Sequence, residues 1–176
     1  SVTDVSIESA IRFSVEAMTR LGVNRLGHNL IPALADFKRF RGTRIKEAAR
    51  ERRAQIDFDI SLLEQGLPLK SVTVQKLKLE KEALEKMPED AEVVYDYDRE
   101  EKIEDLAIRA HYALDMAIER GVVVETNPTS NIGISPYMKS YDEHVLGTYL
   151  NYRDGHGRMV KVSINTDNMA LFSTSM

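Results

Sequence analysis

The feature that most constrains the fold is a helix-like passage followed by a strand-like run, which occurs three times along the chain. In each passage apolar residues recur at helical spacing, a glycine or a turn ends the stripe, and a run rich in β-branched residues follows. The three passages are residues 11–28, 107–131 and 140–167. Because helices and strands alternate, the sequence predicts an α/β fold with a parallel sheet.

Local features of these passages lead to three further expectations. Residues 127–131, NPTSN, are expected to form a proline-containing turn. The third helix is expected to continue through Tyr152, before a glycine-containing turn into the last strand. The chain begins at Ser1 and stops soon after that strand, without the covering helix of an α/β unit, so we expect it to be a piece of a longer protein.

The middle of the chain does not follow this alternation and is interpreted as an insertion. Residues 44–66 and 71–87 are predicted to be long, charged helices, and a short strand is predicted within residues 89–102. The first part is basic and the later part acidic, which leaves three interpretations open: solvated helix faces, a subunit interface, or a phosphate or nucleic-acid patch. The predicted organisation is residues 1–40 (a helix and a strand ending at His28), 41–104 (the insertion) and 105–176 (the last two strands and their helices).

Composition excludes several classes of protein. The chain has no cysteine, which excludes disulfides and cysteine-ligated zinc, and its net charge of −4 gives no overall attraction to nucleic acid or anionic membranes. No apolar run reaches membrane-span length and no charged-then-apolar leader opens the chain. We therefore expect a soluble cytoplasmic protein with no membrane partner.

Each predicted strand ends in a polar cluster. The clusters are RLGHN around His28, NPTSN around Asn131 and INTDN around Asp167. Taken singly, each has an ordinary explanation as a turn or a cap. Consecutive parallel strands would instead gather them around one mouth, where barrel enzymes place their chemistry.

These clusters also carry a family resemblance. The chain contains, in this order, RLGHN, ETNPTSN, a downstream His144 and INTDNMALFSTS. The adenosine deaminase branch of the amidohydrolase superfamily carries R-I-G-H-G, E-V-C-P-T-S-N, a His and L-N-T-D-D-P in the same order. This sequence resembles that branch over residues 10–40 and 105–176. The resemblance implies the C-terminal part of a (β/α)8 TIM-type barrel, about three helix-strand units, with a charged helical insertion. The chain departs from the family at Asn29 (for Gly), Asn127 (for Cys), Val145 (for Pro), Asn168 and Met169 (for Asp-Pro).

The resemblance implies a function and a set of site residues. It implies zinc-dependent hydrolytic deamination of adenosine or an adenine nucleotide, with adenosine in RNA as a further possible substrate. Asp167 would be a catalytic zinc ligand, His28 would hold the attacking water and stabilise charge, and Asn168 would contact the purine. The family's His-x-His, its further His ligand and its proton-donating Glu have no counterpart here, so these groups are expected outside this chain.

The other histidines and the polar residues of the second cluster are given supporting roles. His144 is expected to fix a loop, His111 is expected to be a packed or surface histidine of a helix, and His156 is expected to be exposed in a turn. Thr129, Ser130 and Asn131 are expected to shape the mouth through local hydrogen bonds.

The long insertion in a divergent member is similar to the large deaminase subunit of the RADAR phage-defence system. That likeness implies a homo-oligomer assembled through the insertion and a partner ATPase. The alternative is a non-catalytic scaffold or interaction protein of a large assembly, built on a degenerate deaminase barrel.

Overall fold

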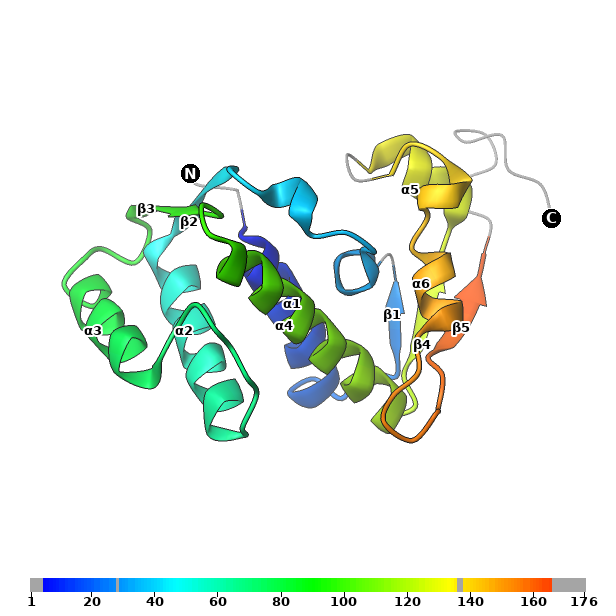
Figure 1. The fold of residues 1–176 in the computed structure, drawn as a ribbon, viewed down its shortest axis with the longest axis horizontal. Coiled ribbons are helices and arrows are strands. Elements are labelled where there is room, and N and C mark those ends of the chain that lie inside the picture. Colours follow the sequence, from blue (N-terminus) through cyan, green and yellow to red (C-terminus); the bar gives the residue numbers. More distant parts are fainter. Residues whose placement is uncertain (1–4, 28, 136–137, 166–176) are drawn as a thin grey trace. The chain divides into compact units, whose positions relative to one another are not determined.

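The computed structural model describes residues 5–27, 29–135 and 138–165. These residues form a mixed α/β structure, as the sequence predicts (Figure 1). The α-helices are α1 (Ile7–Thr19), α2 (Ala49–Glu64), α3 (Val74–Leu84), α4 (Glu100–Glu119), α5 (Pro128–Ile134) and α6 (Leu146–Asn151). The strands are β1 (Arg25–Gly27), β2 (Arg44–Ala48), β3 (Glu92–Asp96), β4 (Val123–Thr126) and β5 (Lys161–Ile164). The short 3-10 helices are η1 (Ile31–Ala33), η2 (Lys38–Phe40) and η3 (Tyr141–Glu143).

The chain divides into two compact units. We call Ser1–Phe13 with Asp36–Ala110 the helical unit, and Ser14–Ala35 with His111–Met176 the sheet unit. None of the described helices is both long enough and apolar enough to cross a membrane.

The sheet unit contains a three-stranded parallel sheet in the order β1-β4-β5 (Figure 1). Gly27 is in register with Glu125, and Glu125 with Ser163, so the three strands end in line. The prediction of parallel strands is therefore confirmed. The sheet formed by the described residues does not close into a barrel.

Two expectations about the sheet unit are wrong. Residues 127–131 do not form a simple turn, because Pro128 opens helix α5. Proline suits a first helical position, since its fixed φ matches the helix and its missing N–H would have no intrahelical partner there. The third helix does not continue through Tyr152: it ends at Asn151, and His144, in an extended conformation, separates it from η3.

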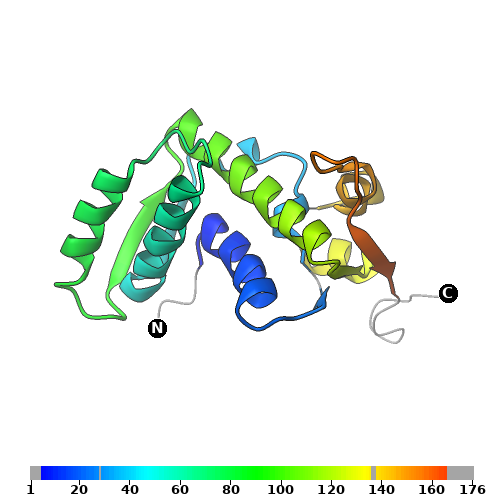
Figure 2. The same cartoon turned by 90° about the horizontal axis from the view of Figure 1, so that it is seen from below.

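In the helical unit, β2 and β3 form an antiparallel pair, and α2 and α3 pack side by side against it (Figure 2). The short strand predicted within residues 89–102 is confirmed as β3. The helix predicted over residues 44–66 begins only at Ala49, because residues 44–48 pair with β3 as strand β2. A strand-strand pairing between segments so far apart in sequence outweighs the local helix propensity.

The interior of the helical unit combines an apolar cluster with buried charges. Ala49, Ile56, Leu77 and Leu84 form the cluster, and partly buried residues of α2 and β3 pack around it. Three ionisable side chains of the insertion, Glu47, Arg52 and Asp59, are buried together with Glu8 and Arg109 from outside it, so the insertion is not simply a set of solvated helix faces.

Candidate functional site

Three predicted site residues, His28, Asp167 and Asn168, lie outside the described residues. The structure describes the strands that lead to them. The Asn165 N–H donates to the Thr126 carbonyl (3.0 Å), which continues the β4-β5 pairing beyond Ile164. Because β1, β4 and β5 are parallel neighbours, the segments after them start from one edge of the sheet.

A hydrogen-bonded cluster fixes the segment that follows β4. The side-chain oxygen of Asn131 accepts hydrogen bonds from the Asn127 N–H (3.0 Å) and from Nε2 of His144 (3.2 Å). The Ser130 hydroxyl donates to the Asn127 carbonyl (3.1 Å). These three residues are buried with His144, and the hydrogen bonds between them replace contacts with water.

The contacts of His144 define its protonation. Its Nδ1 accepts a hydrogen bond from the Leu146 N–H (3.0 Å), so in the neutral ring Nε2 carries the proton and donates to Asn131. Burial lowers the pKa of His144 below its ordinary value and favours this neutral form. Because both ring nitrogens have partners, His144 fixes the loop, as expected from the sequence, and does not present a free nitrogen to a metal.

A second brace holds the residue directly after His28. The Ser14 hydroxyl of α1 donates to the side-chain oxygen of Asn29 (2.6 Å), and the Tyr149 hydroxyl of α6 donates to the Asn29 carbonyl. Tyr149 is fully buried, which raises its pKa and keeps the hydroxyl protonated as a donor. Asn29, a departure from the family motif, is thus a structural anchor for the segment after β1.

A polar row crosses the sheet just before its carboxyl edge. Arg25 Nε donates to Glu125 Oε2 (2.5 Å), and Arg25 Nη2 donates to the Ser163 hydroxyl (3.4 Å). The three residues come from three adjacent strands and share one face. Sequence reasoning missed this row because it depends on the strand register.

The described residues do not fit a zinc site by themselves. They contain no group of three or more histidine or acidic side chains placed to hold a metal ion. His111 is exposed and lies against Tyr152, with ring centroids 5.4 Å apart, and His156 is exposed in a turn. Asp167, the predicted ligand, is outside the described residues.

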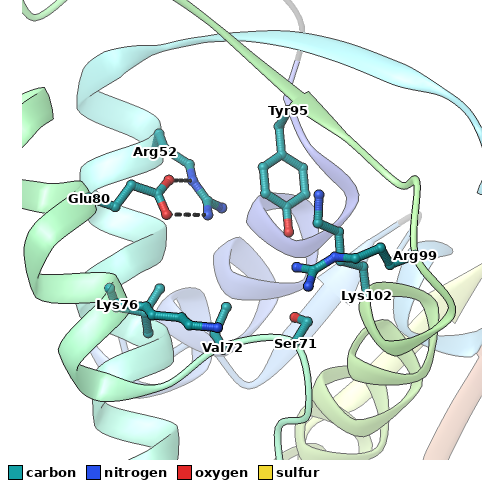
Figure 3. Close-up of a pocket in the computed structure, with 9 residues that line it drawn as sticks. Arg52, Ser71, Val72, Lys76, Glu80, Tyr95, Arg99 and Lys102 are labelled. Atoms are coloured by element: carbon teal, nitrogen blue, oxygen red, sulfur yellow. Dashed lines mark hydrogen bonds and ion pairs between the residues drawn. The ribbon is translucent and has the colours of Figure 1, made fainter.

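The helical unit contains a cavity of about 300 Å³ that sequence reasoning did not locate (Figure 3). Four of its nine lining residues are basic, and the lining comes from α2, α3, β3, the start of α4 and the segments that precede α3 and α4: Arg52, Ser71, Val72, Lys76, Leu77, Glu80, Tyr95, Arg99 and Lys102. The basic character of residues 38–53 left a phosphate patch open as one interpretation, but three of the four cations at the cavity come from later in the chain. No spacing rule links these positions, because the fold brings them together.

A scan against protein-family models and a search of curated proteins found no match for this chain.

Proposed function

We propose that this chain is part of a hydrolytic deaminase that acts on adenosine or an adenine nucleotide. The observation that carries the proposal is the order β1-β4-β5 of the parallel sheet. In this order, the three strands that bear the RLGHN, NPTSN and INTDN motifs are neighbours in the sheet. The resemblance to adenosine deaminases requires these strands to be adjacent in the same order. In the proposal the sheet is the last part of an eight-stranded barrel, whose other strands lie outside this chain.

In the proposed reaction, water adds to the amino-bearing ring carbon of adenine, the carbon-nitrogen bond to the amino group breaks, and ammonia leaves. A zinc ion lowers the pKa of bound water towards 7 and so supplies a nucleophile near neutral pH. Asp167 would be one of its ligands, and the others would come from polypeptide outside this chain. His28 would hold the attacking water and exchange a proton with it, and Asn168 would donate a hydrogen bond to the purine at any pH.

The described residues would keep the loops that carry these groups in place. The brace on Asn29 adjoins His28 in sequence, and the Asn131-His144 cluster fixes the segment after β4. A position error of about 1 Å can cost an enzyme about 100-fold in rate. These hydrogen bonds therefore serve as positioning contacts in the proposed site.

The proposal extends to the setting of the enzyme. Adenosine in RNA is included among the substrates, and the helical unit would assemble copies of the protein into an oligomer. By the likeness to the RADAR deaminase subunit, an ATPase would be the partner. A cytoplasmic location is also part of the proposal.

The substitution Asp167→Ala tests the proposal. In the complete protein it removes a ligand and a negative charge, so we expect both zinc content and formation of inosine products to fall. Asp142→Ala is the matched control, because Asp142 is an exposed acid of the same unit. Full activity of a zinc-loaded Asp167→Ala protein would overturn the assignment of Asp167.

A further inference from the structure

We propose that the cavity of the helical unit binds a small molecule through a phosphoryl group. The proposal is independent of the deaminase reaction and concerns residues 52–102 alone. It selects the phosphate interpretation of the charged insertion and specifies a half-open pocket rather than an extended basic surface. A cavity of about 300 Å³ is at the lower end of the size range of small-molecule sites.

The charges around the cavity favour an anion. Four cations and one carboxylate, Glu80, line it. Lys102 is already engaged, since its ammonium group lies 2.9 Å from Asp96 Oδ1 and 2.8 Å from Asp98 Oδ1. Lys76 has no ion-pair partner among the described residues, and Arg99 has only a 4.0 Å approach to Asp98. In Figure 3 the side chains of Lys76 and Arg99 reach towards the cavity from opposite sides. Two cations therefore remain available to a ligand.

The buried cation at the cavity, Arg52, is held by two carboxylates. Arg52 is 2% exposed, and its Nε and Nη2 bind Glu80 at 2.7 and 3.3 Å. Its Nη1 is 3.6 Å from Glu8 Oε1, beyond hydrogen-bond distance, and has no hydrogen-bond partner among the described residues. This Nη1 atom is buried beside Glu8, so Arg52 contributes positive charge to the wall of the cavity rather than a free N–H.

Two helix N-termini lie at the cavity, and at the first of them the N–H and hydroxyl of Ser71 already donate to Asp105 Oδ2 (2.9 and 2.5 Å). Ser71 and Val72 immediately precede the Thr73 cap of α3, and Arg99 immediately precedes α4. Helix N-termini carry partial positive charge and commonly bind phosphate groups. Together with the guanidinium groups, which match the oxygen geometry of phosphate, they favour a phosphoryl group over a single carboxylate.

The shape of the site favours a small molecule over a nucleic-acid strand. Binding along a strand needs an extended basic groove with aromatic side chains at intervals. Here a single aromatic ring, Tyr95, lines the pocket, and the Arg52 guanidinium lies 4.2 Å from its centroid. The pocket suits one phosphorylated group, which inorganic phosphate, pyrophosphate or a nucleotide could each supply.

Calorimetric titration of the protein with phosphate, pyrophosphate and ATP tests the proposal. Lys76→Gln and Arg99→Gln are each expected to weaken binding by about tenfold, as for the loss of one hydrogen bond to a charged group. Lys78→Gln is the control, because Lys78 is an exposed lysine of α3 that does not line the cavity. Both pocket variants change exposed side chains, and circular dichroism verifies that they are folded.

Each outcome decides the proposal. Binding of phosphate or pyrophosphate that depends on Lys76 and Arg99 but not on Lys78 supports the site and shows that the phosphoryl group suffices. The same dependence for ATP alone supports it with a nucleotide as the ligand. Binding that all three substitutions weaken equally would be general electrostatic attraction and would overturn the proposal, as would no binding of any of the three compounds.

Discussion

The Asp59-Arg109 ion pair is expected to make a large contribution to the stability of the helical unit. Arg109 Nε and Nη2 contact the two carboxylate oxygens of Asp59, each at 2.8 Å, and the two side chains are 2% and 1% exposed. Gln55 Nε2 also donates to Asp59 Oδ1 (2.9 Å). Substituting Arg109→Met keeps an unbranched apolar side chain of comparable length but leaves the buried carboxylate with one neutral donor.

The expected loss follows from the burial of both charges. Removing one partner of a buried ion pair costs about 3–5 kcal/mol, because the remaining charge has neither water nor a counter-ion. The double substitution Asp59→Leu with Arg109→Met removes both charges and is expected to cost far less than the sum of the two single changes. The remaining cost is about 1–3 kcal/mol, since Gln55 loses its acceptor.

Urea unfolding of the wild type, both single variants and the double variant measures this coupling. The exposed pair Lys81-Asp57, 2.6 Å apart, provides the control, and Lys81→Met is expected to change stability by less than about 1 kcal/mol. If Arg109→Met also costs less than about 1 kcal/mol, or if the two single losses are additive in the double variant, the reasoning is refuted.

Three further substitutions test other buried polar groups. Tyr149→Phe removes the donor to the Asn29 carbonyl and should lower the free energy of unfolding by about 1–2 kcal/mol in urea titrations; unchanged stability would contradict this contact. Burial depresses the pKa of His144 below its ordinary 6.5, so the unfolded chain protonates first and stability should fall as pH drops below about 6.5. His144→Gln should lessen that fall, whereas an identical pH profile would oppose the assignment. Burial raises the pKa of Glu47, so its stabilising contribution is present below about pH 4 and is lost as pH rises through its folded-state value. At pH 7 the Glu47→Gln variant should therefore be at least as stable as the wild type, and any gain in stability should disappear below about pH 4. A variant less stable than the wild type at pH 7 would contradict the raised pKa of Glu47.

The parts of the fold that the sequence predicted are those with a local signal. Apolar periodicity located α1 and α4, and β-branched runs located β4 and β5. Gly121, at φ +65°, occupies the left-handed conformation expected after a helix end. Strand β2 was missed because its pairing with β3 spans more than 40 residues, and local propensity does not register that contact.

The candidate sites also differ in how far they could be predicted from the sequence. The order of the three strand-end motifs was readable from the sequence, and the structure made those strands neighbours. The Asn29 brace depends on Tyr149, 120 residues away, and the cavity combines Arg52 with Arg99. Contacts of this range come from packing and leave no pattern in a single sequence.

The most direct test of the deaminase proposal is product formation by the complete, zinc-loaded protein with and without His28→Gln. The wild type is expected to convert adenosine, an adenine nucleotide or adenosine in RNA to the inosine form. His28→Gln should retain zinc but turn over at least about 100-fold more slowly, since positioned acid-base groups contribute about 10²- to 10⁴-fold. Undiminished turnover by His28→Gln, or no inosine product from any of these substrates, would contradict the account.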